Sequence, residues 1–154
     1  MNPSAEPKDC ALYVHVPWCV KKCPYCDFNS HALGGELPEA RYVDALLEDL
    51  AVETSARTFG NVGSVFIGGG TPSLLSGDAV VRLIEGIRGR LSLSSDCEIT
   101  LEANPGTVEA GRFEAFRRAG VNRLSVGVQS FDDDLLRRIG RIHDGAGAHA
   151  AIRQ

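Results

Sequence analysis

The sequence has no apolar run that approaches the roughly 18 residues needed by a membrane-spanning helix. Acidic residues outnumber basic ones by 20 to 16, so the chain lacks the positive charge on which nucleic-acid binding depends. Residues 1–9 are polar, contain two prolines and have no apolar signal core. We therefore interpret residues 1–9 as a disordered N-terminus. We expect the protein to be cytoplasmic, at most membrane-associated, with no nucleic acid among its partners.

Cysteine is neither abundant nor paired. The chain has five cysteines, and an odd number without a signal segment argues against a secreted disulfide framework. Cys19, Cys23 and Cys26 fall within eight residues, which favours metal binding. Cys10 and Cys97 belong to no motif, and we interpret both as structural or incidental thiols.

Strand and helix patterns alternate along the chain. Short β-rich runs predict strands at residues 12–16, 64–67, 98–103 and 123–128. Helical spacing of apolar residues predicts helices from Pro38 through Leu50, from Val80 to Leu91, from a cap at Thr107 to Gly120, and after the acidic residues 132–134. This order predicts a parallel α/β sheet. A complete (β/α)8 barrel takes about 250 residues, so we expect residues 10–154 to be the N-terminal part of a larger barrel.

The spacing C-x3-C-x2-C lets three thiolates reach one compact metal centre from a single loop. Iron–sulfur clusters usually take four cysteines. With three, one iron lacks a protein ligand and can bind a substrate directly, as an open catalytic zinc site does. Two other interpretations stay open. His15 or His31 could complete a structural zinc site, and a redox Cys-x2-Cys pair is conceivable, although it leaves Cys19 unexplained.

Other polar and glycine residues lie where predicted strands end. The run Gly68-Gly69-Gly70-Thr71-Pro72 follows the second strand, and glycine lets a backbone approach a ligand closely. Glu102 and Gln129 end the third and fourth strands, and side chains at that edge of a parallel sheet share one pocket. His15, on the first strand beside Tyr13, is the candidate catalytic residue.

These motifs resemble those of the radical S-adenosylmethionine (SAM) superfamily. In that family the open iron is chelated by the amino and carboxylate groups of SAM, and electron transfer then cleaves the sulfonium to a 5′-deoxyadenosyl radical. Longer runs are similar to one branch, the oxygen-independent coproporphyrinogen III oxidase group and, within it, the HemW haem chaperones. These runs are LYVHVPWCVKKCPYCDFNSH (12–31), FIGGGTPS (66–73), LEANPG (101–106) and GVNRLSVGVQSF (120–131).

The resemblance implies a fold, a site and partners. The fold would be α/β, the N-terminal part of a radical SAM partial (β/α)6 TIM-like barrel with parallel strands. Cys19, Cys23 and Cys26 would bind a [4Fe-4S] cluster. The residues that line SAM sites would be Tyr13, Tyr25, Gly69, Gly70, Thr71, Glu102, Gln129 and Arg141. The implied partners are haem or porphyrin, an electron donor such as flavodoxin or ferredoxin, and haem-accepting respiratory proteins.

One position separates the two functions within this branch. The oxidase pattern carries a further cysteine two residues after the third, where this chain has Phe28. That departure favours a haem chaperone that delivers haem to respiratory enzymes. The alternative is an enzyme, a coproporphyrinogen dehydrogenase-type oxidoreductase that converts propionates to vinyls by SAM-dependent radical decarboxylation. A zinc-stabilised binding module is a second alternative. The candidate haem ligands are His15, His31, His143 and His149.

Overall fold

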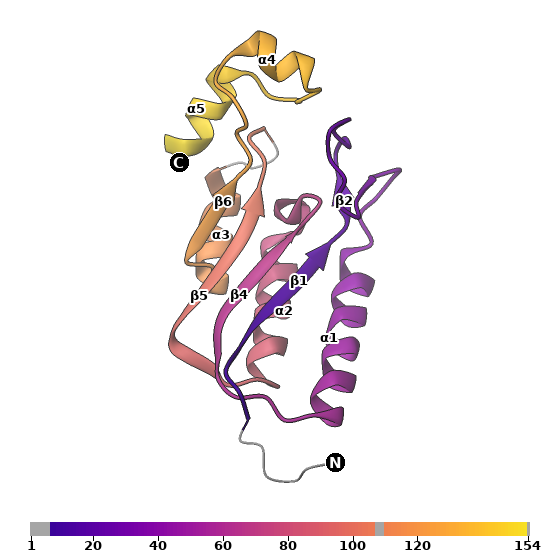
Figure 1. Ribbon diagram of the computed structural model, residues 1–154, viewed down its shortest axis with the longest axis vertical. Helices are drawn as coiled ribbons and strands as arrows, with labels where there is room; N and C mark the ends of the chain where they lie inside the picture. Colours follow the sequence, from indigo (N-terminus) through magenta and orange to yellow (C-terminus); the bar gives the residue numbers. More distant parts are fainter. Residues whose placement is uncertain (1–6, 107–109, 154) are drawn as a thin grey trace.

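A parallel four-stranded sheet forms the centre of the protein. The computed structural model describes residues 7–106 and 110–153, so the Thr107 cap and most of the predicted disordered N-terminus lie outside the described residues. The strands are β1 (Cys10–Val16), β4 (Val62–Gly69), β5 (Leu93–Ala103) and β6 (Arg123–Val126), and they lie in the order β1-β4-β5-β6 (Figure 1). Every neighbouring pair is parallel. The predicted parallel α/β sheet is therefore confirmed.

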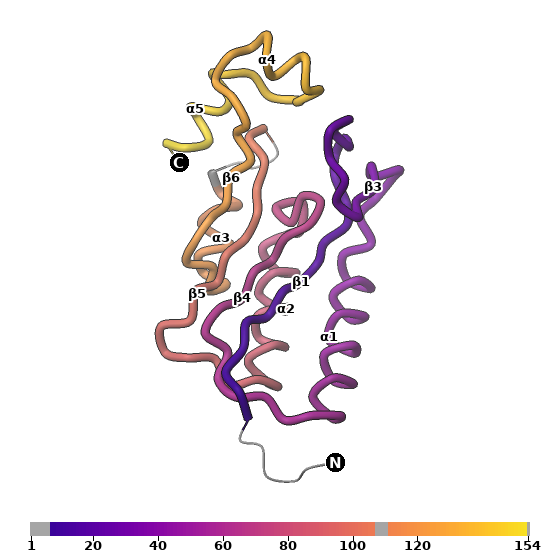
Figure 2. Tube along the Cα trace, in the orientation of Figure 1, coloured from indigo at the N-terminus to yellow at the C-terminus, as the bar shows by residue number. Residues whose placement is uncertain are grey.

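Three helices cover one face of this sheet. They are α1 (Glu39–Ala56), α2 (Gly77–Arg88) and α3 (Ala110–Ala119). Both the ribbon and the Cα trace show α2 and α3 behind the strands and α1 beside β1, at the right of the view (Figures 1 and 2). The core forms between them and the sheet, where Ile67, Leu83 and Phe116 are at most 1% exposed. None of the helices in the described stretches is long and apolar enough to cross a membrane.

Helix α2 is shorter than its apolar pattern predicts. The Ser76 side chain caps its start by accepting a hydrogen bond from the Ala79 amide at 3.1 Å. The helix ends at Arg88, and the amide of its C-cap residue, Gly89, donates to the Glu85 carbonyl. Leu91, predicted as part of the helix, therefore lies beyond it. Its side chain still packs against the core, which explains why the apolar pattern continues.

Short elements surround the carboxyl ends of the strands. The parallel pair β2 (Trp18–Cys19) and β3 (His31–Ala32) brackets the cysteine-containing segment. A 3-10 turn, η1 (Pro72–Leu74), follows β4. Helices α4 (Asp133–Arg138) and α5 (Gly145–Arg153) lie at the top of Figure 1. As the acidic run predicts, Asp132 caps α4 by accepting from the Leu135 amide at 2.9 Å.

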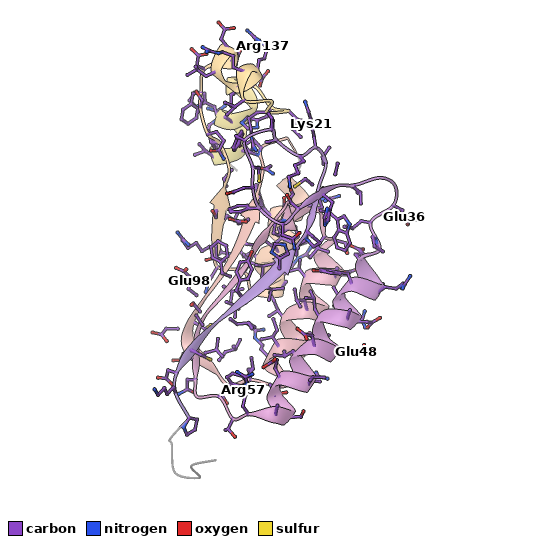
Figure 3. The ribbon with its side chains drawn as sticks, turned by 45° about the vertical axis from the view of Figure 1, so that its right-hand side comes forward. Lys21, Glu36, Glu48, Arg57, Glu98 and Arg137 are labelled. Carbon is purple, nitrogen blue, oxygen red and sulfur yellow. The ribbon has the colours of Figure 1, made fainter. Side chains whose placement is uncertain are left out.

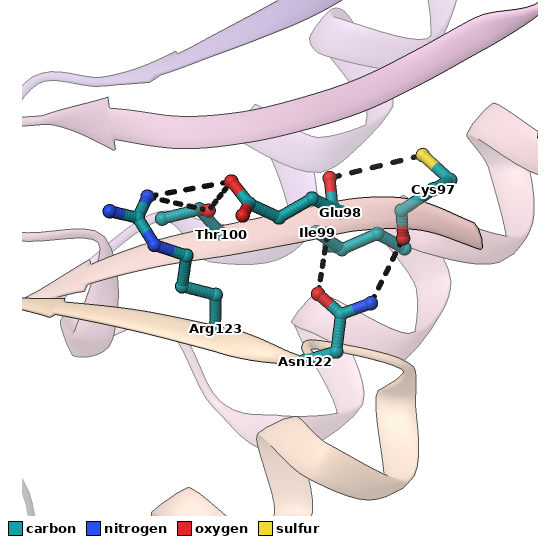
Figure 4. Close-up of polar contacts among 6 residues, drawn as sticks. All are labelled: Cys97, Glu98, Ile99, Thr100, Asn122 and Arg123. Carbon is teal, nitrogen blue, oxygen red and sulfur yellow. Dashed lines mark hydrogen bonds and ion pairs between the residues drawn. The ribbon is translucent and has the colours of Figure 1, made fainter.

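Side chains reinforce the ladder between β5 and β6 (Figure 4). The Asn122 amide oxygen accepts from the Ile99 amide at 2.7 Å, and its nitrogen donates to the Cys97 carbonyl at 2.9 Å. Arg123 donates to Glu98 and to the Thr100 hydroxyl. These contacts support the register of β6 against β5 at the start of β6.

Strand β6 ends two residues earlier than predicted. It stops at Val126, although the amide of the predicted strand residue Gly127 still donates to the Ala103 carbonyl of β5 at 2.8 Å. The Val128 amide donates to the Val126 carbonyl, and the Ser130 amide donates to the Val128 carbonyl, both at 2.9 Å. Each of these two bonds spans only two residues, so the chain bends after Gly127 and the β-rich sequence does not extend the strand.

Candidate cluster and cofactor site

The cysteine loop, residues 19–26, and the carboxyl ends of β4, β5 and β6 enclose a cavity of about 330 Å³. The structure brings most of the predicted site residues to its wall. Those lining residues are Cys19, Cys23, Tyr25, Cys26, Gly69, Gly70, Thr71, Glu102, Gln129 and Arg141. Residues more than 100 positions apart in the sequence thus meet at one site, as the strand-end argument predicts.

Tyr13 and His15 lie outside this lining. Both are on β1 and line a larger cavity of about 410 Å³ between β1 and α1, whose wall is mostly aliphatic. The Tyr13 hydroxyl is 3.0 Å from His15 Nδ1, and the Tyr13 ring stacks on Phe66 with centroids 6.2 Å apart. The structure therefore places both residues beside the cysteine-lined cavity rather than in its wall.

A carbonyl clamp holds the chain that follows the third cysteine. We use this name for the carbonyls of Phe28, Asn29 and Ser30, which accept hydrogen bonds from side chains. Lys22 Nζ donates to Phe28 and Ser30 at 3.1 and 3.0 Å, and His15 Nε2 lies 2.7 Å from the Asn29 oxygen. A carbonyl can only accept, so Nε2 carries the proton and Nδ1 accepts from the Tyr13 hydroxyl. In this structure His15 anchors the loop, and its catalytic role stays a prediction.

The glycine segment packs directly on the chain that leads into the cysteine loop. The Gly70 amide donates to the Val16 carbonyl and the Thr71 amide to the Trp18 carbonyl, both at 2.7 Å. A Cβ on Gly70 would lie 2.6 Å from the Trp18 oxygen. Gly69 adopts a φ of +119°, which favours glycine, and its amide donates to Glu102 Oε2 at 2.9 Å. This close approach needs glycine at both positions.

Arg141 joins the cysteine loop to the ends of β5 and β6. Its Nη1 lies 3.5 Å from Cys23 Sγ and 3.5 Å from the Tyr25 hydroxyl. Its Nη2 donates to Asn104 Oδ1 at 2.6 Å and also to the Gly127 carbonyl. A guanidinium with several donors suits this bridging position.

Asn104 and Lys22 are site residues that the motif interpretation missed. Asn104 Nδ2 donates to the Thr71 hydroxyl at 2.9 Å, so this amide connects the glycine segment with Arg141. A signal for Asn104 was its place directly after the strand that carries Glu102. Nothing in the sequence distinguishes Lys22 from the neighbouring Lys21. Only the folded chain shows that Lys22 reaches the carbonyl clamp.

Two tyrosine hydroxyls at this end of the sheet stay protonated at neutral pH. Burial, and then the negative charge of Glu102, raises the pKa of Tyr13. Burial is also the largest cause of the raised pKa of Tyr25, where Arg141 acts in the opposite direction and Cys23 adds to the increase. The protonated Tyr13 hydroxyl donates to His15 Nδ1, and the Tyr25 hydroxyl keeps its proton beside Arg141 and Cys23.

The donor set suits an iron–sulfur cluster. Cys19 is 8% exposed, and Cys23 and Cys26 are half-buried on the same cavity. Soft thiolates are the usual ligands of iron–sulfur clusters, in which separate irons take separate cysteines. Within residues 7–106 and 110–153, no three His, Cys, Asp or Glu side chains are grouped closely enough to hold a single metal ion.

His143 lies beside the site, on the chain that follows Arg141. It is 8% exposed, its Nε2 donates to the Val128 carbonyl at 3.0 Å, and its Nδ1 has no partner within the described residues. Burial lowers the pKa of His143, and the charge of Arg141 adds to that decrease, while the Val128 bond and Asp144 oppose it. The folded protein therefore favours the neutral imidazole.

We expect the free energy of unfolding to fall with pH below about 6.5, the ordinary histidine pKa. In that range the unfolded chain binds a proton at residue 143 more readily than the folded chain, so acidification favours unfolding. Urea unfolding between pH 5 and 8 measures this, with His143→Gln as the non-titrating control. Identical pH slopes for the two proteins would contradict the prediction.

The fold and site together define a class of protein: a parallel α/β barrel protein with a three-cysteine loop after its first strand. The sequence model of the Radical SAM superfamily matches residues 13–153. This chain belongs to the radical SAM superfamily. Membership implies a [4Fe-4S] cluster and SAM as cofactors, and the predicted family is confirmed.

Known relatives place the chain within that superfamily. It is 58% identical over 143 residues to the heme chaperone HemW of Escherichia coli, a match that covers 93% of this chain and 38% of the relative. Identity to HemW of Haemophilus influenzae is 49% over 146 residues, covering 92% of this chain and 38% of the relative. The chain therefore spans 38% of the length of either relative.

A solved structure supports the fold. Coproporphyrinogen III oxidase (HemN) from Escherichia coli, a radical SAM enzyme, superposes with a TM-score of 0.84 at 31% identity. The match covers 96% of this chain and 33% of that protein. The prediction that the chain forms the N-terminal part of a radical SAM barrel is confirmed.

Proposed function

We propose that the protein is a haem chaperone of the HemW type, which delivers haem to respiratory enzymes and carries a [4Fe-4S] cluster with SAM. One observation carries this proposal: the three cysteines line the same cavity as the glycine segment and the strand-end residues, in a chain 58% identical to a HemW protein. Phe28 supports the chaperone over the oxidase, because it stands where the oxidase pattern has a further cysteine.

In this proposal Cys19, Cys23 and Cys26 bind the cluster. When bound, the cluster and SAM supply one-electron reductive cleavage of a sulfonium. Cys19 is buried at the base of this loop, and the Arg141 guanidinium would lie beside a cluster held at Cys23. Lys21 is exposed on the same loop, at the same end of the molecule as Arg137 (Figure 3), and this positive charge suits an acidic electron donor such as flavodoxin or ferredoxin.

SAM in this proposal lies in the cavity between the cysteine loop and the strand ends. Glu102 provides a carboxylate for its amino group, and Arg141 provides a cation for its carboxylate. The backbone of the glycine segment can approach SAM closely at Gly69, Gly70 and Thr71. The remaining residues proposed to line SAM sites are Tyr13, Tyr25 and Gln129.

The test of the chaperone uses the full natural chain, reconstituted anaerobically with iron and sulfide. We expect stoichiometric haem binding and haem transfer to an apo-form of a respiratory acceptor. In a parallel reaction, coproporphyrinogen III, SAM and a reductant should give no vinyl product. Formation of vinyl product would overturn the chaperone assignment in favour of the oxidase. A reconstituted protein that contains zinc but no iron would overturn the assignment of a [4Fe-4S] cluster.

We expect Glu102→Gln to weaken SAM binding by about 10- to 100-fold, since a hydrogen bond to a charged group contributes about 1.5–3 kcal/mol. Equilibrium titration of SAM into the reconstituted protein measures the dissociation constant. The matched control is Glu98→Gln, on the same strand, because Glu98 pairs with Arg123 away from the cavity. Equal dissociation constants for the two variants would contradict the assignment of Glu102.

A further inference from the structure

The turn after β6 has an unusual backbone. Gln129 adopts a φ of +69°, the left-handed conformation that residues with a side chain rarely adopt. Within residues 7–106 and 110–153, Gln129 is the only non-glycine residue with a positive φ. Because Gln129 also lines the cysteine-containing cavity, its backbone conformation decides where its amide group points. The Ser130 amide closes the turn around Gln129 by donating to the Val128 carbonyl at 2.9 Å, and contacts from outside the turn add to this bond.

Two side chains from the segment after α4 hold the preceding carbonyls. Arg141 donates to the Gly127 carbonyl, and His143 Nε2 donates to the Val128 carbonyl at 3.0 Å. The Val128 carbonyl also accepts from the Ser130 amide, so it receives one bond from inside the turn and one from His143. Val128 precedes Gln129 directly, and fixing its carbonyl restricts the peptide that determines φ of Gln129.

The environment of His143 supports this role. The ring is 8% exposed, its Nδ1 has no partner within residues 7–106 and 110–153, and His143 does not line the cavity. Its lowered pKa keeps it neutral, with the single proton on the nitrogen that faces Val128. Only one hydrogen bond therefore connects this buried imidazole to the site.

We propose that His143 is a positioning residue that holds Gln129 in its cofactor-facing conformation through the Val128 carbonyl. The inference rests on the proposed function, because it takes Gln129 to be a SAM-binding residue. The alternative is that His143 only fills space, a role that would not need a donor at Nε2. A substitution that keeps the volume but removes the donor therefore separates positioning from space filling.

Three variants of the full natural chain separate these roles. Gln places its amide nitrogen near the position of Nε2 and keeps the donor, Asn is too short to reach Val128, and Leu fills the space without a donor. We expect His143→Leu and His143→Asn to weaken SAM binding about tenfold, and His143→Gln to stay within about threefold of the natural protein. Iron content is expected to be unchanged in all three, since His143 makes no contact with the cysteine loop.

A double-mutant cycle tests whether His143 acts through Gln129. Gln129→Ala alone should weaken SAM binding about tenfold, and adding His143→Leu should weaken it no further. Natural-like binding by His143→Asn and His143→Leu, or additive losses in the cycle, would overturn the inference. If His143→Leu fails to fold, the Asn and Gln variants decide it. A natural protein that carries its cluster but binds no SAM would instead overturn the proposed function on which the inference rests.

Discussion

Replacing Cys19, Cys23 or Cys26 with alanine is expected to abolish iron loading. Each thiolate serves a separate iron, so removing one leaves two protein ligands for a cluster that already has an open position. After anaerobic reconstitution, iron and acid-labile sulfide per chain should fall below about a tenth of the natural content. The reduced protein should also lose the electron paramagnetic resonance signal of a [4Fe-4S] cluster, together with any SAM-dependent formation of 5′-deoxyadenosine.

The other cysteines provide matched controls for this experiment. Cys97 is 8% exposed in the core, and Cys10 is half-buried on β1, so neither faces the cysteine-lined cavity. The Cys97→Ala variant should keep the natural iron content, and its free energy of unfolding should fall by about 1 kcal/mol. Loss of iron in the Cys97 variant, or full loading in any of the three loop variants, would contradict the assignment.

Gly70→Ala is expected to have nearly as large an effect, by a steric route. The new Cβ would lie 2.6 Å from the Trp18 oxygen and 2.9 Å from the Pro17 carbonyl carbon, both of which are backbone atoms. Since backbone cannot move aside as a flexible side chain can, the segment that leads into Cys19 must shift. We expect iron content to fall several-fold and SAM binding to be lost, as measured by iron analysis and by equilibrium titration.

Gly63→Ala is the control for that prediction. Gly63 lies on β4, the strand that ends just before Gly70, but a Cβ there meets nothing within 4 Å. Its free energy of unfolding should change by no more than about 0.5 kcal/mol, and its cluster and SAM binding should be natural. If both alanine variants behave alike, close packing at Gly70 is not what holds the cysteine loop in place.

Much of the fold follows from local patterns in the sequence. Apolar spacing locates α1 and α2 because one helix face must be buried, as Val43 and Leu83 are. The alternation of strands with helices gives a parallel sheet, and that topology brings strand ends such as Glu102 and Gln129 to one edge. The pocket at this edge could therefore be predicted from the topology alone, without any side-chain contact.

The polar contacts that complete the site could not be predicted in this way. Asn104 is paired with Thr71 and Arg141, which lie 33 and 37 residues away, and those pairings exist only once the sheet has formed. The early end of β6 has the same origin, because tertiary bonds from Arg141 and His143 hold carbonyls that a β-rich sequence would otherwise place in a ladder. Local propensity carries no information about such partners.

The carbonyl clamp has a consequence for how metal reaches this protein. Ordering a flexible segment costs about 1–2 kcal/mol per residue in conformational entropy, and a disordered loop would meet that cost when it captures a cluster. Here Lys22 and His15 already order residues 28–30 in the folded chain, so this part of the ordering cost is met during folding. For a cluster bound by the three cysteines, this order would lower the conformational entropy lost on binding.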